Sequence, residues 1–316
     1  PTGRGAASAD EHARQQAKLV RVVQALDPDL AALMELENDG DGPDSALAQF
    51  VAALNAAGPH RDWRAVPSGH GAGGDSIRVG LIYRSSRISP VGAPATLETG
   101  PFARYSRAPL AQAFRAGSGP VFVVVANHFK SKGGCPSATG ADADAGDGQA
   151  CYNATRVATA EALHAWLATD PTGTRPEGSL IIGDLNAHAQ EDPLRALYAH
   201  GWRDAFAITG AQRPYSYVWA GQSARLDHAL LDAGMAAYLR GAAEWHNNAD
   251  ESDRFDYRRD LDADPWRASD HDPVLLGLDL ARCARRRRGT SPARAAIIWP
   301  WTPCPPFRPN PDRCCC

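Results

Sequence analysis

The chain has 316 residues, of which 44% are hydrophobic, enough apolar material to bury one sizeable core. No stretch approaches the roughly 20 apolar residues that span a bilayer, so we expect no membrane insertion. The net charge is −3, but residues 282–316 carry eight Arg and one Asp and contribute +7, which leaves −10 for residues 1–281. Such an acidic body disfavours non-specific binding to nucleic-acid phosphates. It is compatible with the capture of divalent cations, although a solubilising surface is the simpler interpretation.

Seven cysteines are divided between the body and the tail of the chain. Cys135 and Cys151 flank a Gly/Asp-rich loop and are 16 positions apart. A disulfide between them would stabilise the fold by roughly 3 kcal/mol. The alternative is two unrelated thiols. We favour the disulfide, and this implies an oxidising compartment.

Helices and strands are predicted along the whole body. Ser8 and Glu11 have the spacing of a capping box, and apolar residues recur at helical spacing behind them, so residues 9–26 are predicted to form an amphipathic helix. Residues 30–36 are predicted to form a buried strand, and Asp44 is expected to cap a second helix. Further strands are predicted at 77–83, 121–127, 180–182, 225–231 and 273–280, and further helices at 153–168 and 193–200.

The mixed order of these elements, with no Pro/Ser-rich linker between them, predicts one α/β domain over residues 1–281. Residues 282–316 are rich in Arg, Pro and Cys, show no periodicity and are predicted to be disordered. An Arg-rich arm could bind nucleic acid. An unstructured end or a reading-frame extension is the simpler interpretation, so we assign this tail no function.

Four groups of side chains that bind metals or phosphates lie at predicted strand ends, namely Glu35, Asn127-His128, Asp184 with Asn186, and Asp270-His271-Asp272. Each group alone is a weak signal, because Asp-x-Asn is common in turns and a single Glu or His is usually solvated or structural. Strand ends, however, meet at one edge of a sheet, where sites are normally built. The groups together therefore predict one site of acids, amides and imidazoles.

Five ordered motifs carry a resemblance to a known family, namely LMELEN (33–38), NHFKSKGG (127–134), GDLN (183–186), LDH (226–228) and SDHDP (269–273). Over about residues 4–280 the chain resembles the endonuclease/exonuclease/phosphatase superfamily, which has the deoxyribonuclease I-like fold, and is most similar to the bacterial extracellular nucleases. The resemblance implies a four-layer α/β sandwich in which two packed mixed β-sheets are flanked by helices. Relatives begin with an inner strand that would precede Pro1, so this N-terminal strand is expected to be missing.

The resemblance also implies roles for individual residues. It implies catalytic roles for His128, Asp184, Asn186, Asp227 and His271, metal binding by Glu35, Asp270 and Asp184, and substrate binding by Arg107, Asn127 and Lys130. Asp184 and Asn186 would position and activate the attacking water, and the two histidines would flank the phosphate. The expected cofactor is Mg²⁺, with Mn²⁺ or Ca²⁺ as alternatives, because a hard cation held by oxygen ligands stabilises charge on a phosphate.

The sequence therefore predicts a metal-dependent phosphodiesterase. The specific hypothesis is a monomeric nuclease that acts on DNA, with RNA as a further substrate, and that is secreted, displayed at the cell surface or periplasmic. Because a fold does not decide a substrate, the first alternative is a phosphoesterase of the same fold that acts on phospholipids or inositol phosphates. The second alternative is a truncated, inactive binding module.

Two further segments have both a functional and a structural interpretation. Asp142, Asp144 and Asp147 could bind Ca²⁺, but they depart from the EF-hand pattern, and a solvated acidic loop is favoured. Residues 215–219 (YSYVW) could stack nucleobases. Aromatic residues of a strand near the core are commoner, and this interpretation is favoured for the segment.

Overall fold

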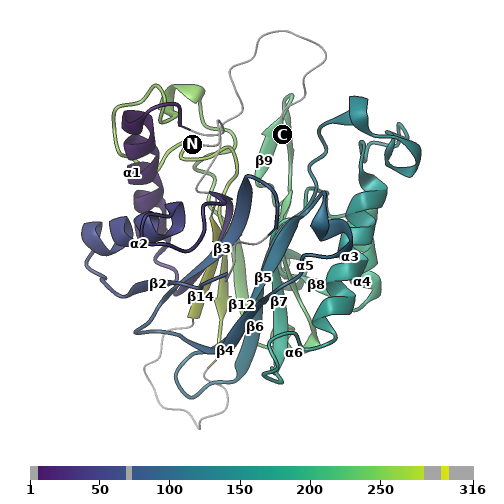
Figure 1. Cartoon of the computed structure of the whole chain (residues 1–316), viewed down its shortest axis with the longest axis horizontal. Coiled ribbons are helices and arrows are strands. Elements are labelled where there is room, and N and C mark those ends of the chain that lie inside the picture. Colours follow the sequence, from purple (N-terminus) through teal and green to yellow (C-terminus); the bar gives the residue numbers. More distant parts are fainter. Residues whose placement is uncertain (1–5, 69–72, 281–292, 299–316) are drawn as a thin grey trace.

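Two six-stranded β-sheets form the centre of the molecule (Figure 1). The computed structural model describes residues 6–68, 73–280 and 293–298. The first sheet has the strand order β12-β13-β14-β1-β3-β2, and the second has the order β4-β5-β6-β7-β11-β8. Strands β9 and β10 form a separate hairpin.

The elements have the following bounds. The first sheet consists of β1 (Leu30–Glu37), β2 (Trp63–Ala65), β3 (Ile77–Arg84), β12 (Leu239–Glu244), β13 (Val274–Leu278) and β14 (Ala293–Ile298). The second consists of β4 (Ser89–Thr96), β5 (Arg107–Arg115), β6 (Val121–His128), β7 (Gly178–Asp184), β8 (Arg203–Asp204) and β11 (Asp227–Leu231). The hairpin is β9 (Tyr217–Trp219) and β10 (Gln222–Ala224). The α-helices are α1 (Ala9–Leu26), α2 (Ala46–Ala57), α3 (Asn153–Leu167), α4 (Asp192–Ala199), α5 (Ala205–Thr209) and α6 (Ala233–Ala236).

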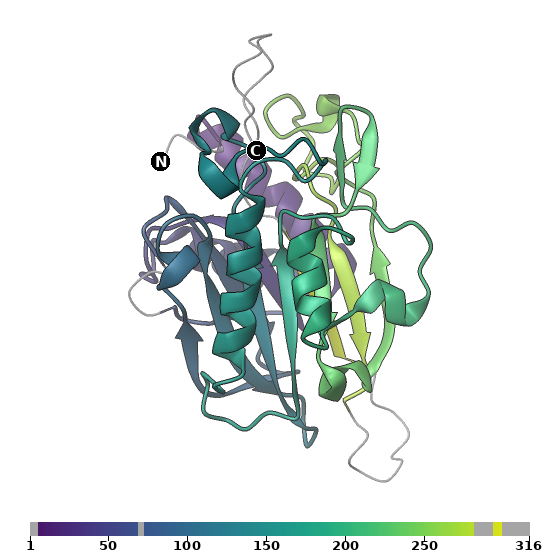
Figure 2. The same ribbon diagram turned by 90° about the vertical axis from the view of Figure 1, so that its right-hand side faces the viewer.

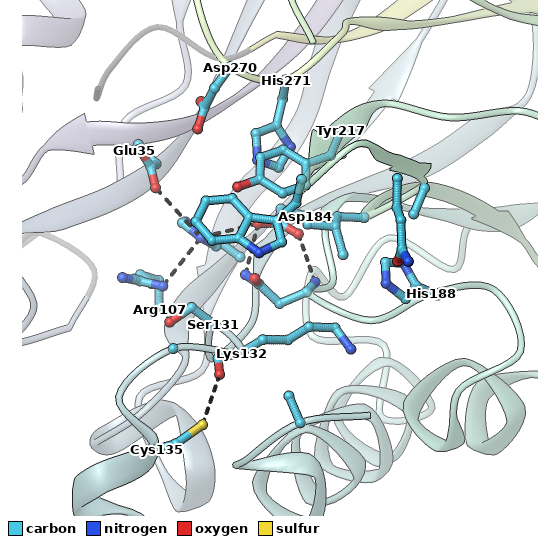
Figure 3. A pocket seen from close by; sticks show the side chains of 18 of the residues that line it. Glu35, Arg107, Ser131, Lys132, Cys135, Asp184, His188, Tyr217, Asp270 and His271 are labelled. Carbon is cyan, nitrogen blue, oxygen red and sulfur yellow. Dashed lines mark hydrogen bonds and ion pairs between the residues drawn. The ribbon is translucent and has the colours of Figure 1, made fainter. Parts of the chain in front are cut away.

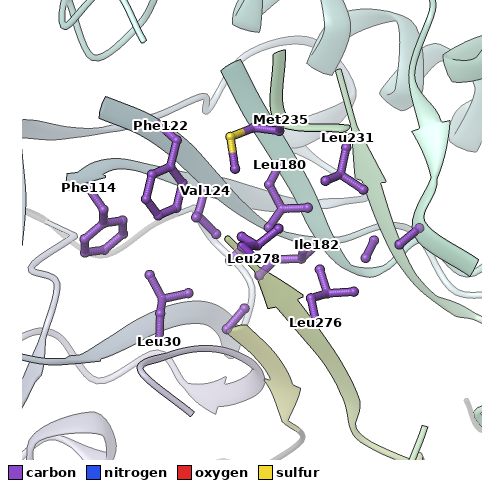
Figure 4. Packing of buried hydrophobic residues seen from close by; sticks show 14 of the residues in the cluster. Leu30, Phe114, Phe122, Val124, Leu180, Ile182, Leu231, Met235, Leu276 and Leu278 are labelled. Atoms are coloured by element: carbon purple, nitrogen blue, oxygen red, sulfur yellow. The ribbon is translucent and has the colours of Figure 1, made fainter. Parts of the chain in front are cut away.

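The two sheets pack face to face around the main hydrophobic core (Figure 4). Strand β1 is apolar at consecutive positions because both of its faces are covered. Leu30 and Met34 point to the core between the sheets, whereas Leu33 packs under α1 and α2. Helices α3 and α4 cover the outer face of the second sheet, as Figure 2 shows. The result is the four-layer sandwich that the sequence predicted.

Helix α1 begins where the sequence predicted. The Ser8 side chain accepts a hydrogen bond from the backbone N–H of Glu11, and this satisfies one of the donors at the helix start. The expected cap of α2 was wrong by one residue, because Ser45 and not Asp44 accepts the N–H of Ala48. None of the helices within the described ranges is long and apolar enough to cross a bilayer.

Strand β14 contradicts the prediction that the whole C-terminal tail is disordered. Residues 293–298 lie in the tail predicted to be disordered, yet they form an inner strand that is parallel to β1 and antiparallel to β13. The inner position between β13 and β1 is therefore occupied by a strand from the C-terminal segment. The rest of the Arg/Pro/Cys-rich tail lies outside the described residues, and disorder there stays a prediction.

Candidate active site

A pocket of about 400 Å³ opens where strands of both sheets end (Figure 3). Side chains from the two sheets, from the loop before β13 and from the β9–β10 hairpin line it, and they include Glu35, Arg107, Ser131, Lys132, Asp184, Asn186, His128, His188, Tyr217, Trp219, Asp270 and His271. The predicted meeting of acids, an amide and imidazoles at one place is therefore observed. The pocket has the size of a small-ligand site.

Glu35 reaches the pocket through an irregularity in β1. The register between β1 and β3 shifts between Leu33 and Leu36, and Glu35 has a φ of +60°. A regular strand would place Glu35 on the same face as Leu33, which packs under the helices. The bulge adds one residue to β1, so Leu36 takes the helix-covered face and Glu35 turns to the pocket.

His128 and Asp184 are paired in register at the ends of the parallel strands β6 and β7. This pairing brings His128 Nε2 to 3.5 Å from Asp184 Oδ2. Strands β6 and β7 approach each other closely at Gly183, where a Cβ would overlap the carbonyl oxygen of Asn127. The glycine therefore allows the strand spacing that places the two functional side chains together.

Asn186 fixes the carboxylate of Asp184. Its backbone N–H donates to Asp184 Oδ1 at 2.7 Å, and its side-chain amide donates to Asp184 Oδ2 at 2.8 Å. The same amide donates to the carbonyl of Phe129. Burial raises the pKa of Asp184 to about 7, and the nearby Asp227 adds to the rise, whereas His271 and the Asn186 N–H oppose it.

His271 forms a buried pair with Asp227 on the neighbouring sheet. The ring Nδ1 lies 2.7 Å from Asp227 Oδ2, and the Ser216 hydroxyl donates to the same oxygen at 2.6 Å. Burial by itself lowers the pKa of His271, but the charge of Asp227 and its hydrogen bond outweigh burial and raise the pKa to about 10. Asp227 does not line the pocket; it orients His271, which does.

Glu35 and Asp270 offer oxygen ligands to a divalent cation. Burial raises the pKa of Glu35 to about 8, and the negative charge of Asp270 adds to the rise. Figure 3 shows both carboxylates pointing into the pocket. Within the described ranges no three His, Cys, Asp or Glu side chains lie close enough to enclose an ion. Mg²⁺ is usually held by one or two carboxylates with several waters, so the two carboxylates fit such an ion.

Arg107 is the predicted substrate-binding residue that the structure brings to the pocket. Its Nε donates to Asp75 Oδ2 at 3.0 Å, and its Nη1 lies 3.3 Å from His128 Nε2. The guanidinium is therefore held beside the imidazole by a carboxylate on its other side. This arrangement suits a bound phosphate, which a planar guanidinium can contact with two N–H groups.

Asn127 and Lys130 do not line the pocket, and their contact with a substrate stays a prediction. Asn127 is fully buried, and its amide donates to the carbonyl of Val125, because alternation along β6 turns it away from His128. The Lys130 ammonium donates to the carbonyls of Ser131 and Gly133 and lies over the ring of Tyr152. Lys132 of the same motif lines the pocket instead.

Sequence reasoning missed several residues of the site. Lys132 lines the pocket and pairs with Glu191 at 2.6 Å, and this pair had no signal beyond the motif itself. Tyr217 lies with its ring 4.6 Å from that of His271, although residues 215–219 were interpreted as core aromatics. The exposure of Trp219 at the pocket overturns that interpretation for the end of the segment.

The loop closed by Cys135 and Cys151 borders the pocket. The structure pairs these cysteines, with their Cα atoms 5.3 Å apart, and Cys135 is one of the lining residues. The acidic residues of this loop have structural partners: Asp142 accepts hydrogen bonds from the backbone and hydroxyl of Thr155, and Asp147 accepts the N–H of Gln149. These contacts agree with an acidic loop rather than a Ca²⁺ site.

Comparisons with known proteins identify the family. The model of the Endonuclease/Exonuclease/phosphatase family matches residues 5–271. No curated protein matches the chain in sequence.

Three solved structures are similar to this one. D. rerio TDP2 complexed with single strand DNA product is 16% identical, has a TM-score of 0.55, and the match covers 84% of this chain and 92% of that chain. A Bacteroides thetaiotaomicron mannosyl-6-phosphatase is 12% identical with a TM-score of 0.56, covering 86% and 94%. The human Nocturnin catalytic domain with bound sulfate is 16% identical with a TM-score of 0.51, covering 73% and 78%. At these identities the likeness shows the fold. The family model shows more: the chain belongs to the endonuclease/exonuclease/phosphatase family, whose members hydrolyse phosphoester bonds and generally depend on a divalent metal.

Proposed function

We propose that this protein is a nuclease that hydrolyses phosphodiester bonds of DNA, with RNA as a further substrate, by direct attack of a water molecule. The observation that carries the proposal is the meeting of Glu35, His128, Asp184, Asp270 and His271 in one pocket, although they come from different sheets. Reaction at a phosphodiester needs groups that activate water and groups that stabilise negative charge on the phosphate. The pocket contains both kinds.

Each side chain has a proposed role that follows from its contacts. Asp184, held at both oxygens by Asn186, orients the attacking water and accepts its proton. His128 and His271 flank the phosphate, with Asp227 orienting the His271 ring. Arg107 donates to a phosphate oxygen.

Glu35 and Asp270 are the residues that would hold Mg²⁺, with Mn²⁺ or Ca²⁺ as alternatives. Such an ion, when bound, supplies positive charge beside the non-bridging phosphate oxygens. Asp184 is also a proposed ligand, although both of its oxygens already accept hydrogen bonds from Asn186.

Nicking of supercoiled plasmid tests the proposal. We expect nicking with Mg²⁺ or Mn²⁺ and none with EDTA. Asp184→Ala and His271→Ala should each reduce the rate by about 10²-fold or more, because loss of a positioned acid–base group has effects of this size. Asp262→Ala and His60→Ala are matched controls that should nick normally, because both side chains are exposed and neither lines the pocket. Wild-type nicking by Asp184→Ala and His271→Ala would refute the assigned roles.

The same fold also occurs in a mannosyl-6-phosphatase, so phosphomonoesters need a direct comparison. The plasmid assay should be run beside a sugar 6-phosphate, an inositol phosphate and phospholipid vesicles. Release of phosphate or headgroup at a higher kcat/KM than plasmid cleavage would favour another substrate class.

We also propose that the protein acts outside the reducing cytosol, in a secreted, surface or periplasmic form and as a monomer. The support is the bond between Cys135 and Cys151 beside the pocket, since disulfides persist in oxidising compartments. Free-thiol labelling of protein from the native source, with and without reductant, tests this. Both cysteines labelled without reductant would contradict it.

A further inference from the structure

We infer that the β9–β10 hairpin is a stacking platform for an unpaired nucleobase next to the scissile phosphate, with Trp219 as its contact residue. The inference rests on the proposed nuclease function and narrows its substrate to single-stranded or locally opened nucleic acid. Three observations support it: the exposure of Trp219 at the pocket, the anchoring of the hairpin, and the position of Tyr217.

Trp219 is exposed to an extent that core packing does not explain. Its exposed fraction is 47%, and it lines the pocket together with Gln222, its partner across the hairpin. Within the described ranges the other exposed large hydrophobic residues are Phe255, Leu261 and Trp266, and none of the three lines the pocket. An exposed indole costs free energy in water, so its place at the rim of a charged pocket indicates a planar, apolar ligand surface.

The base of the hairpin is fixed to the catalytic residues. Buried Ser216 precedes β9, and its hydroxyl donates to Asp227, the partner of His271. The Ser216 backbone N–H donates to the carbonyl of Ala224 at 3.0 Å, and its own carbonyl accepts the N–H of Asp272 at 2.8 Å. The platform is therefore held at a set position relative to His271, and little ordering is needed when a ligand binds.

Tyr217 extends the platform to the reacting phosphate. Its ring lies 4.6 Å from the His271 ring, and Trp219 follows two residues later on the same strand, so both side chains have the same orientation. The pocket of about 400 Å³ has room for about one nucleotide beside them. With a phosphate at His271, the adjoining base would lie toward Trp219.

Stacking on an indole requires a free base face. A base in a duplex is stacked on both sides and paired, whereas a base in a single strand exposes its ring to a side chain. Arg107 in the same pocket can contact the phosphate of that nucleotide, so the site combines a guanidinium for the phosphate with an aromatic surface for the base. Stacking of this kind contributes about 1–3 kcal/mol per base, or roughly 5- to 150-fold in affinity.

The test compares a fluorescein-labelled single-stranded 12-mer with the same strand carrying tetrahydrofuran abasic residues at its central positions. Dissociation constants are measured by anisotropy in EDTA, which stops hydrolysis. The wild type should bind the ordinary strand about 5- to 150-fold more tightly than the abasic strand. In Trp219→Ala this ratio should fall to about 1, whereas Trp219→Phe should keep most of it. Phe255→Ala, an exposed aromatic outside the pocket, should keep the wild-type ratio.

An unchanged ratio in Trp219→Ala, or equal binding of the two strands by the wild type, would overturn the inference. Circular dichroism of each variant separates loss of the platform from loss of folding. Absence of plasmid nicking together with an intact ratio would refute the proposed hydrolysis and support the platform. Failure of the stacking platform and failure of the proposed hydrolysis therefore give different results.

Discussion

Gly183 stands opposite Asn127 in the parallel pair of β6 and β7, with a φ of +135°. A methyl group there would overlap the Asn127 carbonyl oxygen, and the backbone conformation disfavours any L side chain. We expect Gly183→Ala to lower the free energy of unfolding by at least ~2 kcal/mol, measured by urea denaturation. Gly241→Ala is the matched control, since a Cβ at that strand position meets nothing within 4 Å. Equal stability of the two variants would show that the close approach is not required.

Glu35 is partly buried beside Asp270, so desolvation of its carboxylate and repulsion from Asp270 both oppose folding in the absence of a cation. In EDTA, Glu35→Gln should therefore unfold at a higher temperature than the wild type. In 10 mM Mg²⁺ the wild type should gain thermal stability by mass action, whereas Glu35→Gln should gain little. Differential scanning fluorimetry gives both quantities. An equal Mg²⁺-dependent shift in the two proteins would remove Glu35 from the metal site.

Asp62 provides a pH test away from the pocket. Burial raises its pKa, but hydrogen bonds from Ser86 and Arg84 outweigh burial and lower the pKa to about 2. Because the folded-state pKa lies below the unfolded value of about 4, the stabilisation is present above pH ~4 and is lost as the pH falls toward 2.

We expect Asp62→Asn to lower the free energy of unfolding by ~1 kcal/mol at pH 7, after allowance for solvent screening. The difference from the wild type should shrink between pH 4 and pH 2, as followed by urea denaturation at each pH. A difference that stays constant over that range would contradict the assignment.

The residue types of the site were predictable, but several orientations were not. Asp184, His128 and His271 follow from motifs because paired strand ends bring them together. Lys130 and Lys132 carry the same charge and stand two residues apart in one motif. Only the geometry of the loop decides that Lys132, and not Lys130, reaches the pocket.

At the scale of elements, β14 fills an inner place in the first sheet, between β13 and β1. Its removal would leave two inner strand edges unpaired, and such edges promote aggregation. We expect a chain truncated after residue 281 to unfold at a lower temperature and to aggregate, whereas a chain truncated after residue 298 should behave as the full chain does. Thermal unfolding combined with light scattering measures both. Equal behaviour of the two truncations would contradict a structural role for β14.

The strands and helices of the body were largely predictable, whereas β14 and the bulge in β1 were not. Helix α1 has a regular apolar period and a capping serine, which are local signals. Residues 293–298 stand in Arg- and Pro-rich surroundings, and their strand conformation depends on pairing with β1 and β13, which are distant in sequence. The bulge at Glu35 depends on the register with β3 and cannot be predicted from the spacing of apolar residues along β1.

At the scale of the whole molecule, the site is divided between the sheets. Glu35, Asp270 and His271 belong to strands or loops of the first sheet, whereas Arg107, His128 and Asp184 belong to the second. The packing between the sheets therefore sets the distance between the two groups. The family resemblance predicted the sandwich, but this division required the observed strand order.

This division gives a prediction for core truncations. Leu276→Ala, between the sheets, and Leu163→Ala, on the buried face of α3, should each destabilise the fold by about 2–5 kcal/mol. Leu276→Ala should lower kcat more, because relaxation around its cavity shifts one group of site residues relative to the other. The measurement is kcat for plasmid nicking at a temperature at which both variants are folded. An equal or larger loss in Leu163→Ala would contradict it.

The origin of the site from two separate sheets also bears on whether metal and substrate preference can change independently. On the proposed assignments, β1 and the loop before β13 hold the ion, while β5, β6 and the hairpin contact the substrate together with His271 of that same loop. A hydrogen bond joins the two sets, because the Asp272 N–H in the loop before β13 donates to the Ser216 carbonyl at the base of the hairpin. A substitution that changes the metal preference of this loop should therefore also change how the substrate is held.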